Sequence, residues 1–553
     1  MRKKLLRIVI PRYPYPNVFS HLVMPPLGPF YVGASVRSAL GWDVEIVDEN
    51  NFKGRLNHAV LQKEREASIV GFYGGLTSCI PRVYELARFY RGTGAITIAG
   101  GCHVDAVPEE ALRNDIQIVV TGEGELTTPA VISAIQEGRE TVGIAGTAQL
   151  VDGEMVLVRS KPIEELGALP YPDFSMLFNP RRRLSVIPIS HTRGCIYRCE
   201  FCAVNRFLGP PRMAPIPYTL EHFEKILGMG YRNFFFTDDN FVCDREITLK
   251  LCKGISEILR KSGARVKIAV QVRADIADDD ELIYAMRSAG VSLLAIGLES
   301  PLAEDLKAMR KALQADSMKQ RIQKLRKEGF YIHGMFIFGY PLEETVQGAI
   351  PSFKRQAQMF MRFIREAGID TIQVLKAVPI PGTKLFKRLK LSGSLIPLEK
   401  IGWENYDGNF LTFIPRFGSI MELQNSATRI MKKFYGKANV IKLGLTVAFA
   451  PAVLAIRSAI EWVRLFGLDL IHALRERNFR ALAYIPVKGT MNFKEAIVLA
   501  LRSYKRTVRN YFLRTVGGLT VSRWVSAVRR TKVMESLKKL ELELRSRKLR
   551  QNS

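Results

Sequence analysis

The chain has 553 residues, of which 47% are hydrophobic and 24% are charged, and its formal net charge is +28. It is too long for one ordinary domain, so we expect two or three domains with a sizeable buried core. No run of 18 uninterrupted apolar residues occurs, so we expect no ordinary transmembrane helix. Seven cysteines without a leader peptide indicate a reducing cytoplasm.

Residues 1–140 alternate short apolar strands with helical patterns. This alternation predicts an α/β fold with a parallel, doubly wound, Rossmann-like sheet, which binds ligands at the carboxyl ends of its strands. Glycines fall at those ends, and Gly100, Gly101, Gly122 and Gly124 are candidate binding residues. The predicted strands are Leu5–Ile10, Val44–Val47, Ser68–Phe72, Ala95–Ala99 and Ile116–Val120, and the predicted helices are Tyr31–Leu40, Pro81–Tyr90, Glu109–Leu112 and Thr127–Glu137.

Residues 141–185 are expected to be a connector. The segments Thr147–Leu150 and Met155–Val158 flank Asp152-Gly153, which is a hairpin turn signal. The prolines of Leu169–Asp173 then predict an extended, rigid linker.

Three cysteines, Cys195, Cys199 and Cys202, follow with the spacing C-x3-C-x2-C, directly after the predicted strand Val186–Ile189. A loop at the carboxyl end of a strand is where α/β folds keep their chemistry. Clustered thiolates in a reducing compartment favour zinc or iron–sulfur over disulfides. Three cysteines fill three corners of a [4Fe–4S] cube and leave one iron open. A structural zinc would need a fourth ligand, for which His191 is the only local candidate, so we favour the iron–sulfur cluster.

Residues 186–390 resume the alternation with six new strands and five helical patterns. Six β-α units predict a partial (β/α)6 barrel of the TIM type. The predicted strands are Val186–Ser190, Asn233–Phe236, Val266–Val272, Leu293–Gly297, Tyr331–Phe338 and Thr371–Ala377, and the helices lie at about residues 219–229, 246–262, 279–289, 301–328 and 343–367.

Polar residues cluster at the ends of these strands, where a barrel places its active site. Gln271 and Arg273 end the third strand and could meet a carboxylate or a ribose hydroxyl. The alternative is that strand-end carboxylates cap the next helix, and we favour this alternative for Asp244 and Glu343. The other candidates are Thr237, Asp238, Asp239, Glu299, Ser300, Gly339 and Pro341.

Four further cysteines, Cys79, Cys102, Cys243 and Cys252, form no close group in the sequence. A lone cysteine in an α/β domain is usually a small buried apolar residue. We therefore expect a single cluster.

Residues 391–553 are expected to be mostly helical and basic, since residues 441–553 carry 23 Lys and Arg against 7 Asp and Glu. This asymmetry indicates an anionic surface, either nucleic acid or membrane headgroups. The apolar run Leu443–Ile456, Trp462 and the basic helical segment Lys505–Arg550 are typical of helices in the membrane interface. A solvated helical tail is the alternative. Nucleic-acid stacking needs exposed aromatic platforms, so we favour the membrane.

With Phe201 directly before the third cysteine, the spacing resembles the signature of the radical S-adenosylmethionine superfamily. The resemblance implies that the open iron binds S-adenosylmethionine, and that the reduced cluster cleaves it to a 5′-deoxyadenosyl radical. An external flavodoxin- or ferredoxin-like protein would supply the electron. The resemblance also implies cofactor contacts by Thr237, Asp238 and Asp239 to the amino group, by Glu299 and Ser300 to the ribose or methionine, and by Gly339 and Pro341 to the adenine.

The glycine turns of residues 1–140 resemble the cobalamin-binding domain that precedes many cores of this superfamily. The matching stretches are Pro25–Gly28, Gly41–Val44, Gly100–His103 through Pro108–Glu110, and Gly122–Glu125. The D-x-H-x-x-G motif, whose His ligates cobalt in other cobalamin domains, is absent. Either cobalamin binds without a protein His on cobalt, or the domain has lost its cofactor.

The resemblance covers about residues 5–415 and is shared with hopanoid methylases, anaerobic magnesium-protoporphyrin ester cyclases and lipid ring-forming enzymes. It implies methylation of an unactivated carbon in a hydrophobic, lipid- or isoprenoid-like substrate, in which a second S-adenosylmethionine remethylates cobalamin. Radical cyclisation or carbon–carbon coupling on a lipid or tetrapyrrole is an alternative. A non-catalytic cobalamin or iron–sulfur sensor that binds a partner through its basic tail is another. We expect a cytoplasmic enzyme, peripheral on the inner face of the membrane.

Overall fold

The computed structural model describes residues 4–15, 23–311, 313–343, 350–449, 485–529 and 531–552, and single residues at 463, 467, 471 and 475. The chain divides into two compact units, one formed by residues 1–427 with 528–553 and the other by residues 428–527.

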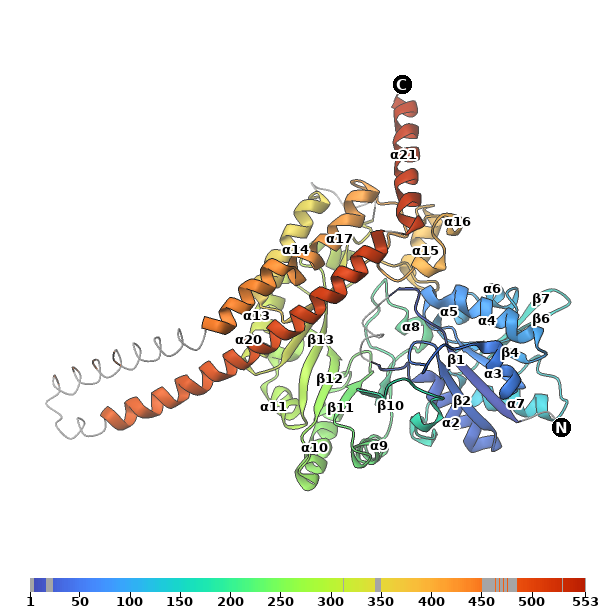
Figure 1. The fold of residues 1–553 in the computed structure, drawn as a ribbon, viewed down its shortest axis with the longest axis horizontal. Coiled ribbons are helices and arrows are strands. Elements are labelled where there is room, and N and C mark those ends of the chain that lie inside the picture. Colours follow the sequence, from blue (N-terminus) through green and yellow to red (C-terminus); the bar gives the residue numbers. More distant parts are fainter. Residues whose placement is uncertain are drawn as a thin grey trace. The chain divides into compact units, whose positions relative to one another are not determined.

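The first sheet of the larger unit has seven strands in the order β2-β1-β3-β4-β5-β6-β7. Figure 1 labels β1, β2, β4, β6 and β7 among them. Strands β1 to β5 are parallel, and β6 and β7 form an antiparallel hairpin. The predicted hairpin is present, but it pairs with β5 and so extends the sheet. The strands are β1 (Leu5–Ile10), β2 (Asp43–Asp48), β3 (Ile69–Tyr73), β4 (Ile96–Gly100), β5 (Ile118–Val120), β6 (Thr147–Val151) and β7 (Glu154–Val158).

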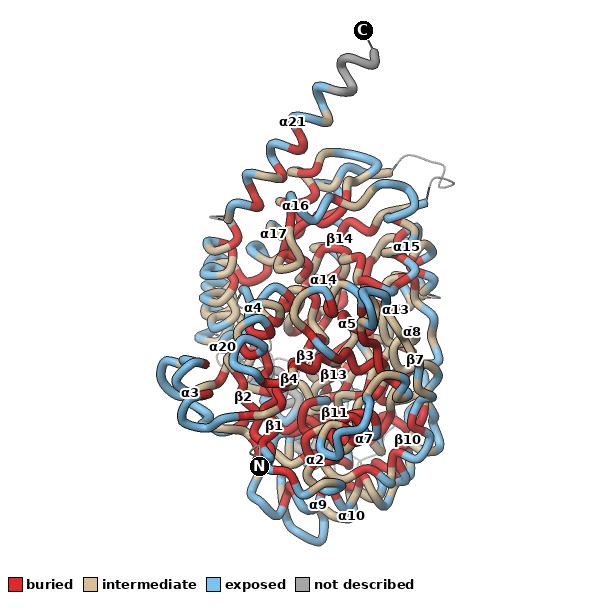
Figure 2. Tube along the Cα trace, turned by 90° about the vertical axis from the view of Figure 1, so that its right-hand side faces the viewer, coloured by how far each residue is buried: buried red, intermediate tan, exposed pale blue. Residues whose placement is uncertain are grey.

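Helices cover both faces of this sheet, as the alternating pattern predicts. In β1, Leu6 and Ile8 belong to a core with residues of α2 (Gly28–Leu40) and α7 (Gly124–Gln136). Leu5 and Val9 belong to a second core with residues of α4 (Ile80–Gly92). Successive side chains of a strand point to opposite faces, so one strand contributes to both cores. Figure 2 shows these strands buried. The doubly wound sheet is confirmed.

Three short helices lie in the connections of this sheet. They are α3 (His58–Glu64), α5 (Cys102–Ala106) and α6 (Pro108–Leu112). Of these three, only α6 is expected from the sequence.

The second sheet has six parallel strands in the order β8-β11-β12-β13-β14-β15, which confirms the partial (β/α)6 barrel. Its strands are β8 (Ile187–Ile189), β11 (Asn233–Phe236), β12 (Lys267–Val272), β13 (Val291–Glu299), β14 (Tyr331–Phe338) and β15 (Thr371–Lys376). Its main helices are α9 (Ile216–Gly228), α10 (Arg245–Ser262), α11 (Asp280–Ser288), α12 (Ala303–Ala308), α13 (Ala315–Lys327) and α14 (Phe353–Ala367).

One helix expected over residues 301–328 is in fact two, α12 and α13. Arg310, between them, has a φ of +56°. L-residues adopt this left-handed conformation only as single residues and not within a right-handed helix, so the helix stops there.

After the barrel come α15 (Lys384–Leu391), α16 (Leu398–Ile401) and the single turn η5 (Trp403–Asn405). Trp403 Nε1 donates a hydrogen bond to Glu110 Oε1 at 2.9 Å, and Tyr15 Oη donates to Asn405 Oδ1 at 2.9 Å. The segment after the barrel therefore returns to the first sheet's domain and closes the larger unit.

The last helix, α21 (Lys532–Asn552), belongs to this larger unit. Met421 N donates to Glu541 Oε2 at 2.9 Å, and Lys400 Nζ lies 2.7 Å from Glu543 Oε2. The basic segment Lys505–Arg550, expected as one helix, is thus divided between α20 (Ile485–Arg529) and α21.

The smaller unit is built from the end of α17 (Ile420–Tyr435), the helical residues 437–449 and most of α20. Arg514 lies 4.2 Å from the ring centroid of Phe434, and a Cβ at Gly517 would lie 2.7 Å from the Tyr435 ring. Residues 450–456 of the predicted apolar run and Trp462 lie outside the described residues. No helix in the described part of the chain is both long and apolar enough to cross a bilayer.

Candidate functional site

The three-cysteine loop leaves the carboxyl end of β8. It contains the short strand β9 (Thr192–Arg193), which pairs with β10 (Arg212–Met213). Gly194 has a φ of +91°, and a Cβ there would lie 2.6 Å from the carbonyl oxygens of Gly209 and Pro210. Only glycine allows this close approach, so the loop conformation is set immediately before Cys195.

Cys195, Cys199 and Cys202 are half-buried on this loop. Burial is the main cause that raises the pKa of Cys202 to about 12, and the nearby Asp239, Cys199 and Cys195 contribute to this shift. No three His, Cys, Asp or Glu side chains among the described residues converge on a point that could hold one metal ion. In an iron–sulfur cube each thiolate ligates its own iron, so the donors need to surround the cluster rather than converge. Three neighbouring soft thiols on one loop fit such a cluster.

Two predicted carboxylates anchor the loop. Asp238 Oδ1 accepts hydrogen bonds from the backbone amides of His191, at 2.8 Å, and Thr192, at 3.0 Å. Asp239 accepts from the Gly194 amide. Burial is the main cause that raises the pKa of Asp238 to about 7 and that of Asp239 to about 6. Asp238 Oδ2 is buried and has no hydrogen-bond partner within the described structure, so it remains able to receive a donor.

Gln271 and Arg273 lie at the end of β12, as predicted. Gln271 Nε2 donates to the Asp238 carbonyl at 3.3 Å. The Arg273 guanidinium lies 4.0 Å from the ring centroid of Tyr197, which is inside the cysteine loop. Arg273 Nε also donates to Asp275 Oδ2 at 2.9 Å. Arg273 thus provides a positive charge beside the loop.

Lys311, which follows α12 and which the sequence reasoning missed, contacts the end of β13. Lys311 Nζ lies 2.6 Å from Glu299 Oε1 and 2.7 Å from the Gly297 carbonyl oxygen. Glu299 is buried and has a φ of +58°. Ser300 Oγ donates to Asp305 Oδ2 at 2.6 Å. Glu299 and Ser300 therefore already have protein partners, which a cofactor would have to share.

Gly339, with a φ of +70°, turns the chain after β14, and Pro341 follows two residues later. A Cβ at Gly339 would lie 2.8 Å from Leu423. The Phe201 ring, from the cysteine loop, lies with its centroid 6.3 Å from that of Tyr340. The turn and the loop are therefore neighbours.

A cavity of about 580 Å³ lies where the carboxyl ends of the two sheets meet. Its wall is largely apolar and includes Met24, Leu27 and Tyr31. None of its described lining residues is a histidine. The cavity brings together seven predicted residues from both sheets: Gly100, Gly101, Gly122, Gly124, Thr237, Asp239 and Gln271.

At two glycines of this cavity, a Cβ atom would lie too close to its neighbours. Gly101 has a φ of +122°, and a Cβ there would lie 2.6 Å from Gly75 N. A Cβ at Gly124 would lie 3.2 Å from Val32. An apolar cavity floored by glycine backbone can receive a large, flat ligand close to the main chain, so the residues present fit a corrin ring without a histidine ligand.

Ion pairs join the glycine turn to the cysteine loop. Glu123, between Gly122 and Gly124, accepts from Arg193 Nη1 at 2.7 Å and from Arg212 Nη1 at 2.6 Å. Burial alone would raise the pKa of Glu123, but these two arginines lower it below its ordinary value. Sequence reasoning missed this contact, although an acid inside a glycine turn and an arginine inside a cysteine motif were both visible.

A second contact of the same kind involves Asp105 of α5. Its carboxylate accepts from Arg206, which follows the cysteine loop, and from Arg159 Nη1 at 2.6 Å. Its Oδ1 also accepts from the Gly122 amide at 3.0 Å. Two ion-pair groups therefore hold the glycine turn, one buried around Glu123 and one partly exposed around Asp105.

The outlying cysteines have different surroundings. Cys79 and Cys252 are buried, whereas Cys243 Sγ lies 4.0 Å from the Gly194 carbonyl oxygen, beside the cysteine loop. The sequence did not predict this proximity. Asp244, the next residue, caps α10 by accepting from Ile247 N at 2.9 Å, which confirms the capping prediction.

A cysteine loop at the mouth of a partial parallel barrel, facing the glycine turns of a doubly wound sheet, defines a radical enzyme with a second cofactor domain. The model of the Radical SAM superfamily matches residues 189–347, and that of the B12 binding domain matches residues 20–132. The chain therefore combines a radical S-adenosylmethionine domain with a B12-binding domain, and in this it resembles the cobalamin-binding radical S-adenosylmethionine enzymes. The cofactors of this class are a [4Fe–4S] cluster, S-adenosylmethionine and cobalamin.

Several proteins are similar to this chain in sequence. An uncharacterized methyltransferase of Pyrococcus horikoshii is 25% identical over 459 residues, covering 79% of this chain and 92% of that protein. Bacteriochlorophyllide d C-8(2)-methyltransferase of Chlorobaculum tepidum is 24% identical over 447 residues, covering 76% and 90%. Hopanoid C-2 methylase of Rhodopseudomonas palustris is 25% identical over 211 residues, covering 38% of each chain.

A solved structure supports the fold. The cobalamin-dependent S-adenosylmethionine radical enzyme OxsB, with aqua-cobalamin bound, matches with a TM-score of 0.63 at 13% identity. The match covers 95% of this chain and 84% of that one. At this identity the likeness shows the shared fold alone.

Proposed function

We propose that this enzyme methylates an unactivated carbon of a hydrophobic, lipid- or isoprenoid-like substrate. The observation that carries the proposal is the apolar cavity of about 580 Å³, which is lined by the glycine turns of one sheet and the polar strand ends of the other. A methyl carrier held by the first sheet would there face the radical site of the second.

In this proposal Cys195, Cys199 and Cys202 ligate the [4Fe–4S] cluster. The bound cluster and S-adenosylmethionine supply hydrogen abstraction, and cobalamin supplies methyl transfer. Asp238 and Asp239 hold the cysteine loop by its amides.

The strand-end residues would position S-adenosylmethionine. The free Asp238 Oδ2 and the side chain of Gln271 suit an ammonium group, and the Arg273 guanidinium suits a carboxylate. Glu299, Ser300 and the turn at Gly339 to Pro341 would receive the ribose and the adenine, beside Phe201.

The glycine turns at Gly100, Gly101, Gly122 and Gly124 would hold cobalamin through backbone contacts. The absence of histidine among the described lining residues of the cavity supports binding without a protein ligand on cobalt. An external electron donor would reduce the cluster, as enzymes of this class require.

The choice of substrate rests on the relatives. The names of two of them give a hopanoid and a bacteriochlorophyllide as methyl acceptors, and both are large, mainly apolar ring systems. Exposed apolar residues on the smaller unit, such as Leu445, Phe449 and Phe512, accompany its basic side chains. This combination is typical of interfacial helices and supports peripheral contact with an anionic membrane, where such a substrate would be found.

The test uses anaerobically reconstituted enzyme with reductant, S-adenosylmethionine, cobalamin and a neutral-lipid extract from the source cells. Label from the S-adenosylmethionine methyl group should appear in a lipid, together with 5′-deoxyadenosine. Methyl label confined to water-soluble products would contradict the lipid substrate. Absence of 5′-deoxyadenosine under every reducing condition would contradict the radical mechanism.

A radical cyclase or coupling enzyme is the second candidate, favoured by its resemblance to the magnesium-protoporphyrin ester cyclases. It would form 5′-deoxyadenosine without transferring a methyl group, so the same assay separates the two reactions. A non-catalytic sensor is disfavoured, because the full set of polar strand ends around the cysteine loop has no use in a protein that only senses.

A further inference from the structure

A buried acid lies between two of the proposed cluster ligands. Glu200 follows Cys199 directly and is 4% exposed. Its carboxylate accepts hydrogen bonds from Tyr340 Oη at 2.6 Å and from Arg388 Nε and Nη2 at 2.8 and 3.0 Å. A guanidinium that holds a carboxylate with two parallel bonds fixes both position and orientation.

The three residues come from three separate elements. Glu200 belongs to the cysteine loop, Tyr340 lies in the turn after β14 between Gly339 and Pro341, and Arg388 lies on α15. Arg388 lies beyond residues 189–347, which match the superfamily model. Nothing in the sequence pattern marks it.

Arg388 binds the loop and the turn at the same time. Its Nη2 also donates to the Pro341 carbonyl at 2.8 Å. The backbone supports the same arrangement, because Leu385 N of α15 donates to the Glu200 carbonyl at 3.1 Å. One guanidinium therefore links the proposed cluster loop to the turn proposed to face adenine.

We propose that Glu200, Tyr340 and Arg388 are positioning residues. They hold the cluster loop and the turn after β14 in the relative position that S-adenosylmethionine binding requires. This inference rests on the proposed roles of the three cysteines and of that turn. A buried ion pair is a poor source of stability, since apolar side chains of similar volume often replace it without loss. Its geometric specificity is what a cofactor site needs, because small displacements of reacting groups cost large factors in rate.

The test compares Arg388→Gln, Arg388→Lys and Lys387→Gln in the full-length, anaerobically reconstituted protein. Lys387 is an exposed cation on the same helix, so its replacement removes the same charge without touching the loop. The readouts are iron content, the electron paramagnetic resonance spectrum of the reduced cluster before and after S-adenosylmethionine is added, and the Kd of S-adenosylmethionine.

We expect Arg388→Gln to raise this Kd by about 10- to 100-fold, the range typical when an outer partner of a metal site is lost. The spectral change on adding S-adenosylmethionine should also weaken. Arg388→Lys keeps the charge but loses the pair of parallel hydrogen bonds, so its Kd should lie between those of the wild type and Arg388→Gln. The Kd of Lys387→Gln should match that of the wild type. An unchanged Kd and spectrum in Arg388→Gln would overturn the inference.

Two further variants keep the test decisive. If Arg388→Gln does not fold, Tyr340→Phe removes one hydroxyl and should still raise the Kd by several-fold, and an unchanged Kd there would overturn the inference. Glu200→Gln combined with Arg388→Gln should be no worse than the more damaging single change, because the two act as one unit. Additive losses would contradict this. Failure of the wild type itself to assemble a cluster would instead contradict the proposed function.

Discussion

Gly101 illustrates how a single residue limits the cavity between the two sheets. Its φ of +122° lies in a region that is open essentially only to glycine, and a Cβ would lie 2.6 Å from the backbone of Gly75. The chain can pass close to a ligand there because both Gly101 and Gly75 lack side chains.

Replacing Gly101 with Ala should therefore impair cobalamin retention more than global stability. The backbone strain is of the order of 1–3 kcal/mol, and the shift of the turn falls on the cavity wall. Purified Gly101→Ala should bind hydroxocobalamin at least tenfold more weakly than the wild type, as a strain of about 1.4 kcal/mol or more predicts, and should retain less of it on gel filtration. Gly92→Ala, where a Cβ meets nothing within 4 Å, is the control. Equal retention in both variants would place cobalamin elsewhere.

The second prediction at this scale concerns the cysteines. Replacing Cys79, Cys102, Cys243 and Cys252 together with Ala should leave about four irons per reconstituted chain, as one [4Fe–4S] cluster requires. Cys243 is the informative member, because its sulfur lies beside the loop at Gly194. Cys199→Ala should lose the cluster. Loss of iron in the fourfold variant would mean that the cluster uses a ligand outside the three-cysteine motif.

At the scale of elements, the contact between the glycine turn and the cysteine loop is electrostatic. Glu123 holds Arg193 and Arg212, and all three side chains are nearly buried. Arg193 also lies 2.7 Å from Glu125 and over the Tyr31 ring. Glu123 of the glycine turn and Arg193 of the cysteine loop line the same cavity. A displacement of either element should therefore disturb the proposed cofactor sites on both.

Glu123→Gln should weaken both cofactor sites at once. Removing one partner of a buried ion pair costs about 3–5 kcal/mol, since the opposite charges remain buried. We expect lower cobalamin retention, a lower unfolding temperature and faster alkylation of the loop cysteines in the cluster-free protein. Glu137→Gln, which breaks an exposed pair with Arg139, should leave all three measurements unchanged. Normal cysteine protection in Glu123→Gln would show that the two elements are independent.

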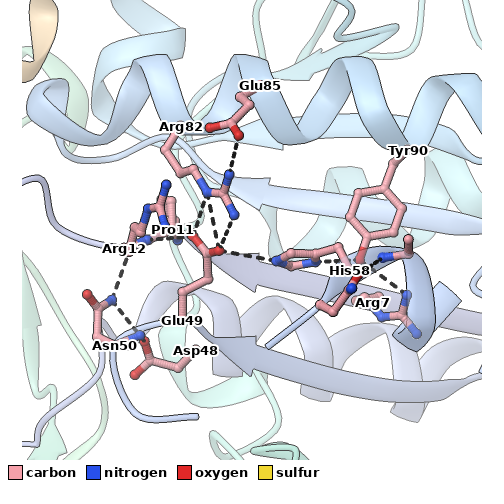
Figure 3. Close-up of polar contacts among 12 residues, drawn as sticks. Arg7, Pro11, Arg12, Asp48, Glu49, Asn50, His58, Arg82, Glu85 and Tyr90 are labelled. Atoms are coloured by element: carbon pink, nitrogen blue, oxygen red, sulfur yellow. Dashed lines mark hydrogen bonds and ion pairs between the residues drawn. The ribbon is translucent and has the colours of Figure 1, made fainter. Parts of the chain in front are cut away.

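A second polar group ties β2, α3 and α4 together (Figure 3). Glu49 follows β2 and binds Arg82 Nη2 at 2.6 Å, His58 Nε2 at 3.2 Å and the Arg12 amide at 2.8 Å. Burial alone would raise the pKa of Glu49, but these donors lower it from 4.5 to about 2.

The lowered pKa makes a prediction about acid stability. A carboxylate whose pKa is depressed by folding stabilises the fold above its unfolded pKa, and loses this effect as the pH falls through the folded one. The unfolding temperature of the wild type should exceed that of Glu49→Gln at neutral pH. The gap should narrow as the pH falls from 4.5 towards 2. If the difference in unfolding temperature did not depend on pH, the shape of the Glu49 side chain rather than its charge would account for its contribution to stability.

At the scale of the whole molecule, the positive charge is concentrated towards the carboxyl end. In the smaller unit, exposed Lys433, Lys437, Lys442, Lys505 and Arg523 accompany exposed apolar side chains. Salt screens the contact of the cations with an anionic membrane, but it does not screen the contact of the apolar side chains. Binding to anionic vesicles should therefore fall partly, not wholly, as salt is raised.

Changing these five cations to Gln should weaken the salt-sensitive part, because each contributes about 1 kcal/mol near an anionic bilayer. Changing Leu445 and Phe512 to Ser should instead remove the part that survives high salt. Cosedimentation with vesicles measures both. These variants are preferable to truncation, because α21 is part of the larger unit and contacts the rest of it through Glu541 and Glu543. Tight binding to transfer RNA with no binding to vesicles would contradict the membrane proposal.

The local pattern of the sequence was sufficient for the two sheets, for most helices and for the cysteine loop. Strand and helix periods depend on neighbouring residues, and the C-x3-C-x2-C spacing is itself a local property, so both can be read without tertiary information. The exceptions, such as the break at Arg310, occur where one backbone conformation overrides a continuous pattern.

Only the tertiary structure decided which side chains meet. Glu200 contacts Arg388, which lies 188 positions away in the sequence, and Arg193 contacts Glu123, which lies 70 positions away. Lys311 binds Glu299, which the sequence analysis had assigned to a cofactor. Such pairs leave no periodic trace, because their partners are brought together by the order of strands in each sheet and by the docking of the sheets. The sequence therefore determined the class of enzyme and the loop proposed to carry its cluster, and the fold determined the contacts that hold that loop in place.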